Sequence, residues 1–257
     1  MLRPLPALVS GLLLAACERG FLPLGGRFEV GQDAMVVFVG GDGAAGGDLY
    51  ALQADGGGAI PITFSVVGEL RPALSPDGGR VAFLRGGTLT DTLPASVWVL
   101  NLVNGAERRV PLLLEAGRPE QVGWSSDGAT LVLRTAQGIY RAPAPPARGT
   151  PRPVPGPERV AAESSLAVLL GTPAFARVVP CDDPDALCVV GDSGPPALLA
   201  EQARDAARWG GDSVAYLAGD RLVVRPLGAG RPRVIAWSGV PARPRQLTAF
   251  PGASGRR

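Results

Sequence analysis

The side chains of this chain that could do chemistry are restricted by one absence, because its 257 residues include no histidine. Without histidine there is no imidazole base, no Ser–His pair and no histidine metal ligand. Residues 191–194 (GDSG) have the order of a serine-protease nucleophile segment, and Asp212 with Ser213 repeats the Asp-Ser pair. Both need a base to take the serine proton, so we interpret them as turns between strands. Catalysis would have to rest on carboxylates, tyrosine or arginine.

Two of the three cysteines flank an acidic segment, residues 182–185 (DDPD). In an exported protein, Cys181 and Cys188 are expected to form a disulfide around a hairpin loop. The three aspartates of the segment could instead offer oxygen ligands to Ca²⁺, although their spacing is not that of a calcium loop. We therefore predict the disulfide and no metal site.

Residues 41–46 (GDGAAG) match the glycine pattern of a dinucleotide fingerprint. That fingerprint needs a helix that opens at the third glycine, so that the helix N-terminus meets the pyrophosphate. Here an apolar, strand-like run follows at once, so we interpret the glycines as a loop and predict no cofactor. A glycosidase-type pair of carboxylates stays open, because the sequence cannot set the distance between two carboxylates.

The composition indicates one large domain made of short elements. The 36 glycines and 26 prolines are spread along the chain, which favours many turns and short strands over long helices. The 25 basic residues are all arginine and are scattered among 23 acidic ones, for a formal charge of +2. We attribute the arginine usage to biased base composition and expect no nucleic-acid partner, because so even a balance leaves no electrostatic footprint.

Residues 1–16 have the character of an export signal. Arg3 gives a positive start, and the apolar run over residues 5–14 is too short to stay as a membrane-spanning helix. Residues 14–17 (LAAC) then resemble the lipobox of bacterial lipoprotein signal peptides. The resemblance implies that Cys17 is lipidated, becomes the mature N-terminus and anchors the chain to a bacterial membrane, facing the periplasm. Residues 17–26 would form a tether, and Glu18 favours the outer membrane; an ordinary secretory signal or a fortuitous apolar start are the alternatives.

A tight turn followed by an apolar strand recurs along the chain. Proline presets the turn, aspartate can bond the backbone two residues on, and glycine tolerates a positive φ. The motif residues of the two clearest copies are Ser75, Pro76, Asp77 and Gly78, and Trp124, Ser125, Asp127 and Gly128.

Apolar runs recur at intervals of about 35 to 50 residues, the range of four-stranded propeller blades. They lie at residues 36–39, 81–84, 131–133, 166–169 and 214–217. A second run follows each of them, at residues 49–52, 97–100, 139–140, 187–190 and 222–224. A third strand is expected in some units, for example at residues 108–113 and 233–237. Residues 201–208 are the one helix-like stretch, and residues 243–250 could supply a closing strand.

These units resemble the WD40-like PD40 blade of the β-propeller in TolB and related periplasmic proteins. That blade carries a Trp-Ser-Pro-Asp-Gly turn, an apolar strand and then an Ile-Tyr strand, which residues 49–50 and 139–140 match. The resemblance implies an all-β propeller of about five to six four-stranded blades over residues 27–250, with a flexible tail at residues 251–257. We expect the four tryptophans to pack between blades: Trp98, Trp124, Trp209 and Trp237.

The functional hypothesis is a monomeric, lipid-anchored envelope protein whose propeller binds a protein or peptide partner in the periplasm. It names no catalytic, cofactor-binding or metal-binding residue. One alternative is an envelope hydrolase that acts on glycans or peptides with carboxylates in the propeller channel. Another is a drifted paralogue that has kept no role.

Overall fold

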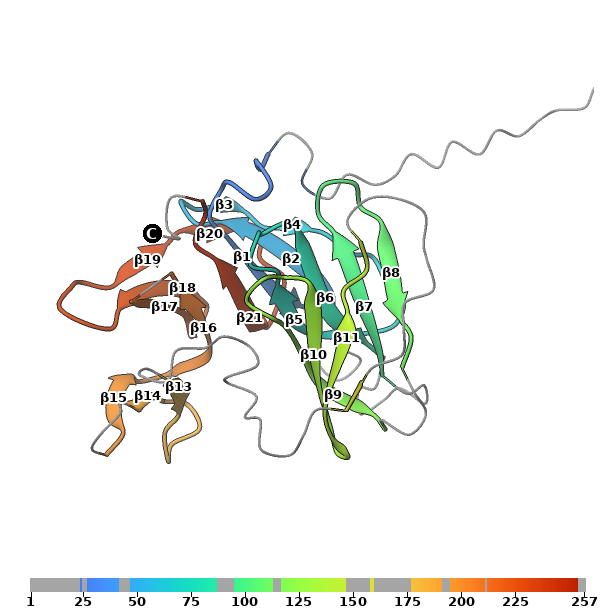
Figure 1. The fold of residues 1–257 in the computed structure, drawn as a ribbon. Helices are drawn as coiled ribbons and strands as arrows, with labels where there is room; N and C mark the ends of the chain where they lie inside the picture. Colours follow the sequence, from blue (N-terminus) through green and yellow to red (C-terminus); the bar gives the residue numbers. More distant parts are fainter. Residues whose placement is uncertain are drawn as a thin grey trace, which may run out of the picture.

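The computed structural model describes residues 24, 27–41, 47–86, 95–112, 117–146, 158–159, 177–190, 195–210 and 212–253. Cys17 and residues 42–46, 166–169 and 191–194, which the sequence analysis singled out, lie outside the described residues. Every element in the described part is a β-strand, which confirms the all-β class (Figure 1). A search of the same residues for a helix long and apolar enough to cross a membrane finds none.

The first sheet joins the first strand of the chain to the last one, in the order β21–β1–β2–β4. Its strands are β1 (Met35–Gly40), β2 (Asp48–Gln53), β4 (Ile60–Pro61) and β21 (Arg245–Phe250). Met35 lies opposite Phe250 in the antiparallel pair of β1 and β21. The closing strand expected within residues 243–250 is therefore confirmed.

Four further sheets are antiparallel and keep the order of the chain. The second holds β5 (Glu69–Leu74), β6 (Arg80–Arg85), β7 (Ser96–Asn101) and β8 (Glu107–Val110). The third holds β9 (Pro119–Trp124), β10 (Thr130–Thr135), β11 (Gly138–Pro143) and β12 (Glu158–Arg159). The fourth holds β13 (Arg177–Pro180), β14 (Leu187–Val190) and β15 (Ala197–Ala200). The fifth holds β16 (Ala203–Trp209), β17 (Ser213–Ala218), β18 (Arg221–Pro226) and β19 (Arg233–Ile235).

Strand β1 is buried at every position, because the first sheet is covered on both faces. Successive side chains of a strand point to opposite faces. Val37 accordingly packs with Phe83 of the second sheet in one apolar cluster. Phe38 packs with Leu217 of the fifth sheet in another cluster. The first sheet thus lies between the second and the fifth.

The same alternation connects the remaining sheets. On β6, Phe83 packs toward the first sheet, whereas Leu84 shares a cluster with Leu131 of the third. On β17, Leu217 packs toward the first sheet, whereas Tyr216 shares a cluster with Leu187 of the fourth. The sheets therefore pack in the order fourth, fifth, first, second, third.

One strand of each sheet, here called the inner strand, contacts the inner strand of the next sheet. The contacts run from β13 to β16, β21, β5 and β9 in turn. Sheets that stack face to face and meet along their inner strands have the arrangement of a β-propeller, in which stacking buries the faces between neighbouring sheets and leaves only short edges. The described residues form five sheets of three or four strands. The blade count of five to six stays a prediction.

Three expectations about individual strands were wrong. Residues 201–208 are not helical, because Ala203–Trp209 pairs with β17, and sheet pairing overrides a weak local preference. The strand expected over residues 233–237 is two strands: β19 pairs with β18, and β20 (Trp237–Ser238) runs parallel to β3 (Gly57–Gly58). The strand expected over residues 108–113 ends at Val110, because the next residue, Pro111, has no N–H for the ladder.

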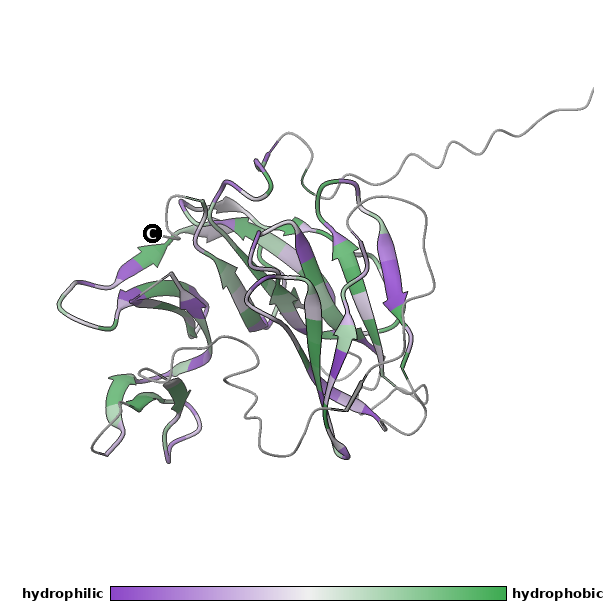
Figure 2. Ribbon diagram, viewed as in Figure 1, coloured by the Kyte–Doolittle hydropathy of each residue, from purple (hydrophilic) through white to green (hydrophobic). Residues whose placement is uncertain are grey.

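The outer edge of the second sheet is hydrophilic. Three of the four residues of β8 are charged, and Figure 2 shows this strand as the most uniformly hydrophilic one facing the viewer. A charged edge strand disfavours pairing with the sheet of another molecule. The four tryptophans lie in or against the apolar clusters between sheets, as expected: Trp98, Trp124, Trp209 and Trp237.

Candidate functional site

The turn that joins β5 to β6 is held by its serine and aspartate side chains. Ser75 Oγ accepts a hydrogen bond from the Arg80 N–H (2.9 Å) and donates one to Asp77 Oδ1. Asp77 Oδ1 also accepts the Gly79 N–H (3.0 Å). Burial raises the pKa of Asp77, but the hydrogen bonds from Ser75 and Gly79 and the charge of Arg80 outweigh it, so the pKa lies below its usual value. The carboxylate is therefore a structural acceptor in the turn.

The turn that joins β9 to β10 repeats these bonds in the third sheet. Ser125 Oγ accepts the Thr130 N–H (3.0 Å) and donates to Asp127 Oδ1 (2.6 Å). Asp127 Oδ1 accepts the Ala129 N–H (2.9 Å). The hydrogen bonds from Ser125 and Ala129 lower the pKa of Asp127. The sequence repeat is thus a repeat of hydrogen bonds.

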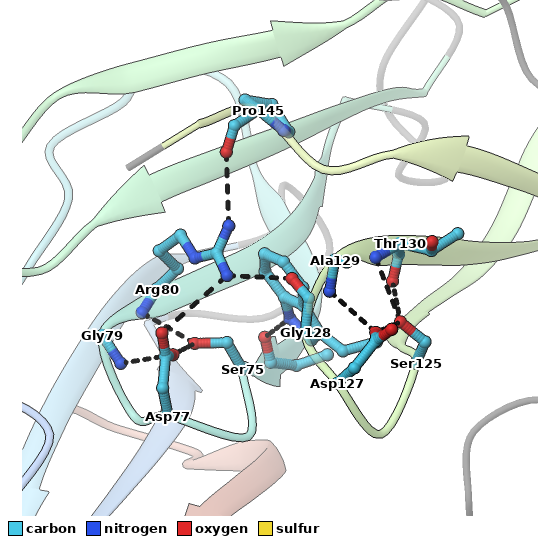
Figure 3. Close-up of polar contacts among 12 residues, drawn as sticks. Ser75, Asp77, Gly79, Arg80, Ser125, Asp127, Gly128, Ala129, Thr130 and Pro145 are labelled. Atoms are coloured by element: carbon cyan, nitrogen blue, oxygen red, sulfur yellow. Dashed lines mark hydrogen bonds and ion pairs between the residues drawn. The ribbon is translucent and has the colours of Figure 1, made fainter. Parts of the chain in front are cut away.

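Arg80 connects the two turns, as Figure 3 shows. Its guanidinium donates to the carbonyl oxygens of Gly128 (2.9 Å) and Pro145 (3.3 Å), and it lies 3.8 Å from Asp77 Oδ2. The same guanidinium stacks on the Trp124 ring, 4.6 Å from its centroid. These contacts fasten the second sheet to the third, so Arg80 and the two turns that it joins have a structural role.

A buried ion-pair network lies near the start of β5. Glu69 is fully buried and pairs with Arg85 (2.6 Å), whose guanidinium also pairs with Glu107 (2.7 Å) and stacks 4.5 Å from the centroid of the Trp98 ring. Thr63 Oγ1 donates a further hydrogen bond to Glu69. Burial raises the pKa of Glu69, and the bonds from Thr63 and Arg85 oppose that rise. Because Glu69 is fully buried and one arginine bridges it to Glu107, this pair is not arranged as an acid and base around a substrate.

The structure joins Cys181 and Cys188 in a disulfide across the hairpin of β13 and β14, where the sequence analysis expected it. In the acidic segment, Asp183 is occupied within the loop, since its Oδ1 accepts the Asp185 N–H (2.9 Å). A search of the described residues for three or more His, Cys, Asp or Glu side chains that could hold a metal ion finds no such group.

A pocket that the sequence analysis did not predict lies where the inner strands β5, β16 and β21 come together. Its volume is about 700 Å³. Its lining comes from these strands and the segment before β21: Arg71, Arg204, Asp205, Arg243, Pro244, Arg245 and Gln246. We call it the inner-strand pocket. Four of the seven lining residues are arginine and one is acidic, so the pocket is cationic.

Each of the three inner strands has an irregular backbone at the pocket. The strands carry one non-glycine residue each in the left-handed region: Arg71 (φ 54°), Asp205 (φ 52°) and Gln246 (φ 53°). The pairing register shifts at the same places in all three sheets. Such bulges bend a strand and redirect a side chain. Residues held in this strained region often cluster at binding sites, which makes the pocket the candidate functional site.

Side-chain bonds fix this part of the inner strands. Gln246 Oε1 accepts the backbone N–H of Arg71 (2.8 Å), which ties β21 to β5. The Arg245 guanidinium donates to the carbonyl oxygens of Gly41 (3.3 Å) and Arg243 (3.4 Å). Arg204 lies 3.9 Å from Asp205, and both side chains are partly exposed. Neither Arg71 nor Arg243 has an ion pair with a carboxylate among the described residues.

The sequence carries no distinctive trace of this pocket. Arginine precedes proline at residues 71–72 and 243–244, near the starts of β5 and β21, but the same pair recurs elsewhere, for example at residues 118–119 and 225–226. The arginines are scattered along the chain, which favours biased base composition as their explanation. Only the stacking of the sheets brings positions 71, 204, 243 and 245 to one place.

Part of the chain is similar in sequence to a known protein. No protein-family model matches the chain. Among curated proteins, the protein TolB homolog of Chlorobium luteolum is 35% identical over 96 residues, which are 36% of this chain and 20% of that protein. Over these 96 residues, this chain resembles TolB. It spans about a fifth of the length of the curated relative that it matches.

Solved structures give more distant likenesses. The match to TolB from Acinetobacter baumannii covers 84% of this chain and 66% of the TolB chain, at 14% sequence identity and a TM-score of 0.37. The periplasmic gluconolactonase of Pseudomonas aeruginosa covers 79% of this chain and 67% of its own, at 13% identity and a TM-score of 0.33. The tricorn protease covers 86% of this chain and 24% of its own, at 15% identity and a TM-score of 0.39. Scores this low say nothing about function, and the fold assignment above rests on the sheets themselves.

Proposed function

We propose that this chain is an envelope lipoprotein whose propeller is a binding module for a protein partner in the periplasm. In this proposal, lipid on Cys17 anchors the chain to a bacterial membrane, with the outer membrane favoured, and residues 17–26 act as the tether. The partner contacts the end of the propeller at which the inner strands β5, β16 and β21 begin. The chain works as a monomer, without a cofactor.

The observation that carries the proposal is the cationic inner-strand pocket. Binding residues of a propeller are expected on the loops and strand ends that a rigid scaffold holds in place. Arg71, Arg243 and Arg204 are exposed there. Phe64 and Val66, in the segment that leads into β5, are 67% and 106% exposed. Exposed charged and apolar side chains on β5 and on the segment that leads into it suit a protein surface as the partner.

The hydrolase alternative finds less support in the same place. A glycosidase places two carboxylates on either side of the bond that it breaks. Asp205 is the one carboxylate among the described residues that line the pocket. A binding role therefore fits this lining better than carboxylate catalysis.

Site-specific photo-cross-linking in the envelope tests the binding role. A photoreactive phenylalanine analogue replaces Arg243 in the full chain, and the matched control carries it at Arg233, an exposed arginine of β19 outside the pocket lining. We expect a discrete adduct with one envelope protein from position 243 and none from position 233. Equal adducts from both positions, or none from position 243 under conditions where the probe is incorporated, would refute the proposed binding face.

Lipidation is tested separately by radiolabelled palmitate incorporation. We expect label in the wild-type chain and none in Cys17→Ala, with the variant released from the membrane fraction. Label that persists in Cys17→Ala would disprove anchoring at this cysteine.

A further inference from the structure

We propose that the inner-strand pocket binds carboxylate groups, and that its ligand is an acidic segment of a protein. This inference rests on the proposed function, because it names the chemistry of the partner that the module takes. Arginine presents a planar fork of donors that matches a carboxylate with two parallel hydrogen bonds.

The charge of the lining gives the sign of the ligand. Arg71, Arg204, Arg243 and Arg245 contribute four positive charges, and Asp205 contributes one negative charge. Arg245 is engaged by the carbonyl oxygens of Gly41 and Arg243, whereas neither Arg71 nor Arg243 has an ion pair with a carboxylate among the described residues. Asp205 lies 3.9 Å from Arg204. An excess of positive charge therefore remains at a concave place, where it attracts anions from solution.

The backbone places these charges on a rigid support. Arg71 and Arg243 both have a positive φ, at 54° and 52°. The strand bearing Arg71 is tied to the strand bearing Gln246 by the 2.8 Å bond from the Arg71 N–H. Because the backbone beneath these arginines is already fixed, ligand binding orders only their side chains, which lowers the entropic cost and favours affinity.

The shape of the lining favours a protein segment over a phosphate ion or a membrane surface. The pocket's volume of about 700 Å³ is far larger than one anion, and its arginines come from separate strands. Asp205 within the lining would repel a compact polyanion, whereas an extended segment can place its carboxylates near the arginines and an N–H near Asp205. The arginines come from separate segments of the chain, so a protein segment that carries carboxylates along its length matches them better than single headgroups do.

The test measures binding of a fluorescent peptide to the full chain purified in detergent. The probe is a short peptide in which Glu alternates with Gly, and its counterpart has Gln in place of Glu. We expect the Glu peptide to bind roughly tenfold more tightly than the Gln peptide, and its affinity to fall as salt rises. Equal affinities for the two peptides would overturn the proposal.

Variants then locate the site. The double variant Arg71→Gln, Arg243→Gln should weaken binding of the Glu peptide about tenfold, while Arg231→Gln, Arg233→Gln, with the same change in charge, should stay within about twofold. Asp205→Asn should tighten binding about twofold or more. Gln246 already occupies the left-handed region at φ 53°, so glutamine is compatible with the backbone at both substituted positions. Unchanged thermal unfolding of the double variant serves as its fold control.

Other anions provide the remaining outcomes. Inorganic phosphate, or vesicles containing phosphatidylglycerol, should not bind the wild-type chain in an Arg71- and Arg243-dependent way. Such binding in the absence of Glu-peptide binding would overturn the proposal. An adduct at position 243 without Glu-peptide binding would end the ligand assignment and leave the binding module intact. Glu-peptide binding without any adduct at position 243 would end the proposed binding module and leave the ligand assignment intact.

Discussion

The two turns at residues 75–80 and 125–130 share their internal hydrogen bonds and differ in what lies around them. In both, a serine hydroxyl and an aspartate carboxylate bond the backbone N–H groups that follow. The sixth residue is Arg80 in one turn and Thr130 in the other. Arg80 reaches the neighbouring sheet, whereas the Thr130 bonds given above stay within its own turn. The comparison shows that the motif secures the turn and that the variable positions secure the sheet.

Truncating the residue before each serine should give the largest difference in stability between the two turns. Trp124 is 5% exposed, donates to the Ala73 carbonyl oxygen (2.8 Å) and carries the stacked Arg80, whereas Leu74 at the equivalent position is only partly buried. We expect Trp124→Ala to lower the free energy of unfolding by about 3–5 kcal/mol. Leu74→Ala should cost less than half as much. Urea unfolding followed by circular dichroism measures both, and equal losses would contradict the unequal roles.

The glycine of each turn gives the next largest contrast. Gly78 and Gly128 have φ of 69° and 68°, so alanine strains both backbones by about 1–2 kcal/mol. A Cβ on Gly78 would lie 2.7 Å from the Phe250 ring, whereas one on Gly128 would lie 3.4 Å from Pro76. Gly78→Ala should therefore be more destabilising than Gly128→Ala by about 1–3 kcal/mol, because it also overpacks the closing strand. Thermal unfolding of the pair checks this, and similar melting temperatures would argue against the contact with Phe250.

Replacing Arg80 with threonine gives the first turn the sixth residue that the second turn has, and should give it the same lack of contacts with the neighbouring sheet. Arg80→Thr removes the bonds to the carbonyl oxygens of Gly128 and Pro145 and the stack on Trp124, at a cost of about 1–3 kcal/mol. Thr130→Ala should change the free energy of unfolding by less than about 0.5 kcal/mol, since the Thr130 bonds with Ser125 use its backbone. Proteolysis between β8 and β9 should speed up in Arg80→Thr alone. Equal protection of both variants would show that the guanidinium does not fasten the sheets.

The smallest contrast is in pH dependence. A depressed folded-state pKa means that the unfolded chain binds the proton more readily, so the stabilisation is present above the usual value of 3.8 and is lost as pH falls through the folded pKa. Asp77→Asn should flatten this acid limb more than Asp127→Asn, because the charge of Arg80 adds to the hydrogen bonds that depress the pKa of Asp77, whereas hydrogen bonds alone depress the pKa of Asp127. Glu69 works in the opposite sense: its raised pKa makes stability fall as pH rises above 4.5. Unfolding midpoints measured across this acidic range test the difference. Identical pH dependence in the two variants would count against a larger contribution from Asp77.

Local patterns in the sequence predicted the local structure well. The Ser, Asp and Gly of each turn define its bonds with residues no more than five positions away, so the pattern is readable before the fold is known. Cys181 and Cys188 are similarly close in sequence, and their disulfide is where it was expected. The helix predicted over residues 201–208 was wrong because Ala203–Trp209 becomes a strand only by pairing with β17, which lies outside that stretch.

The sequence by itself determined that the chain is a series of short, turn-punctuated strands, because hydrogen bonds between near neighbours and the burial of apolar runs depend on order along the chain. Only the tertiary structure decided where positive charge gathers. Arg71, Arg204 and Arg243 are far apart in the chain and share the inner-strand pocket only because β5, β16 and β21 meet there. Electrostatic interaction depends on distance in space, and the stacking of sheets sets that distance.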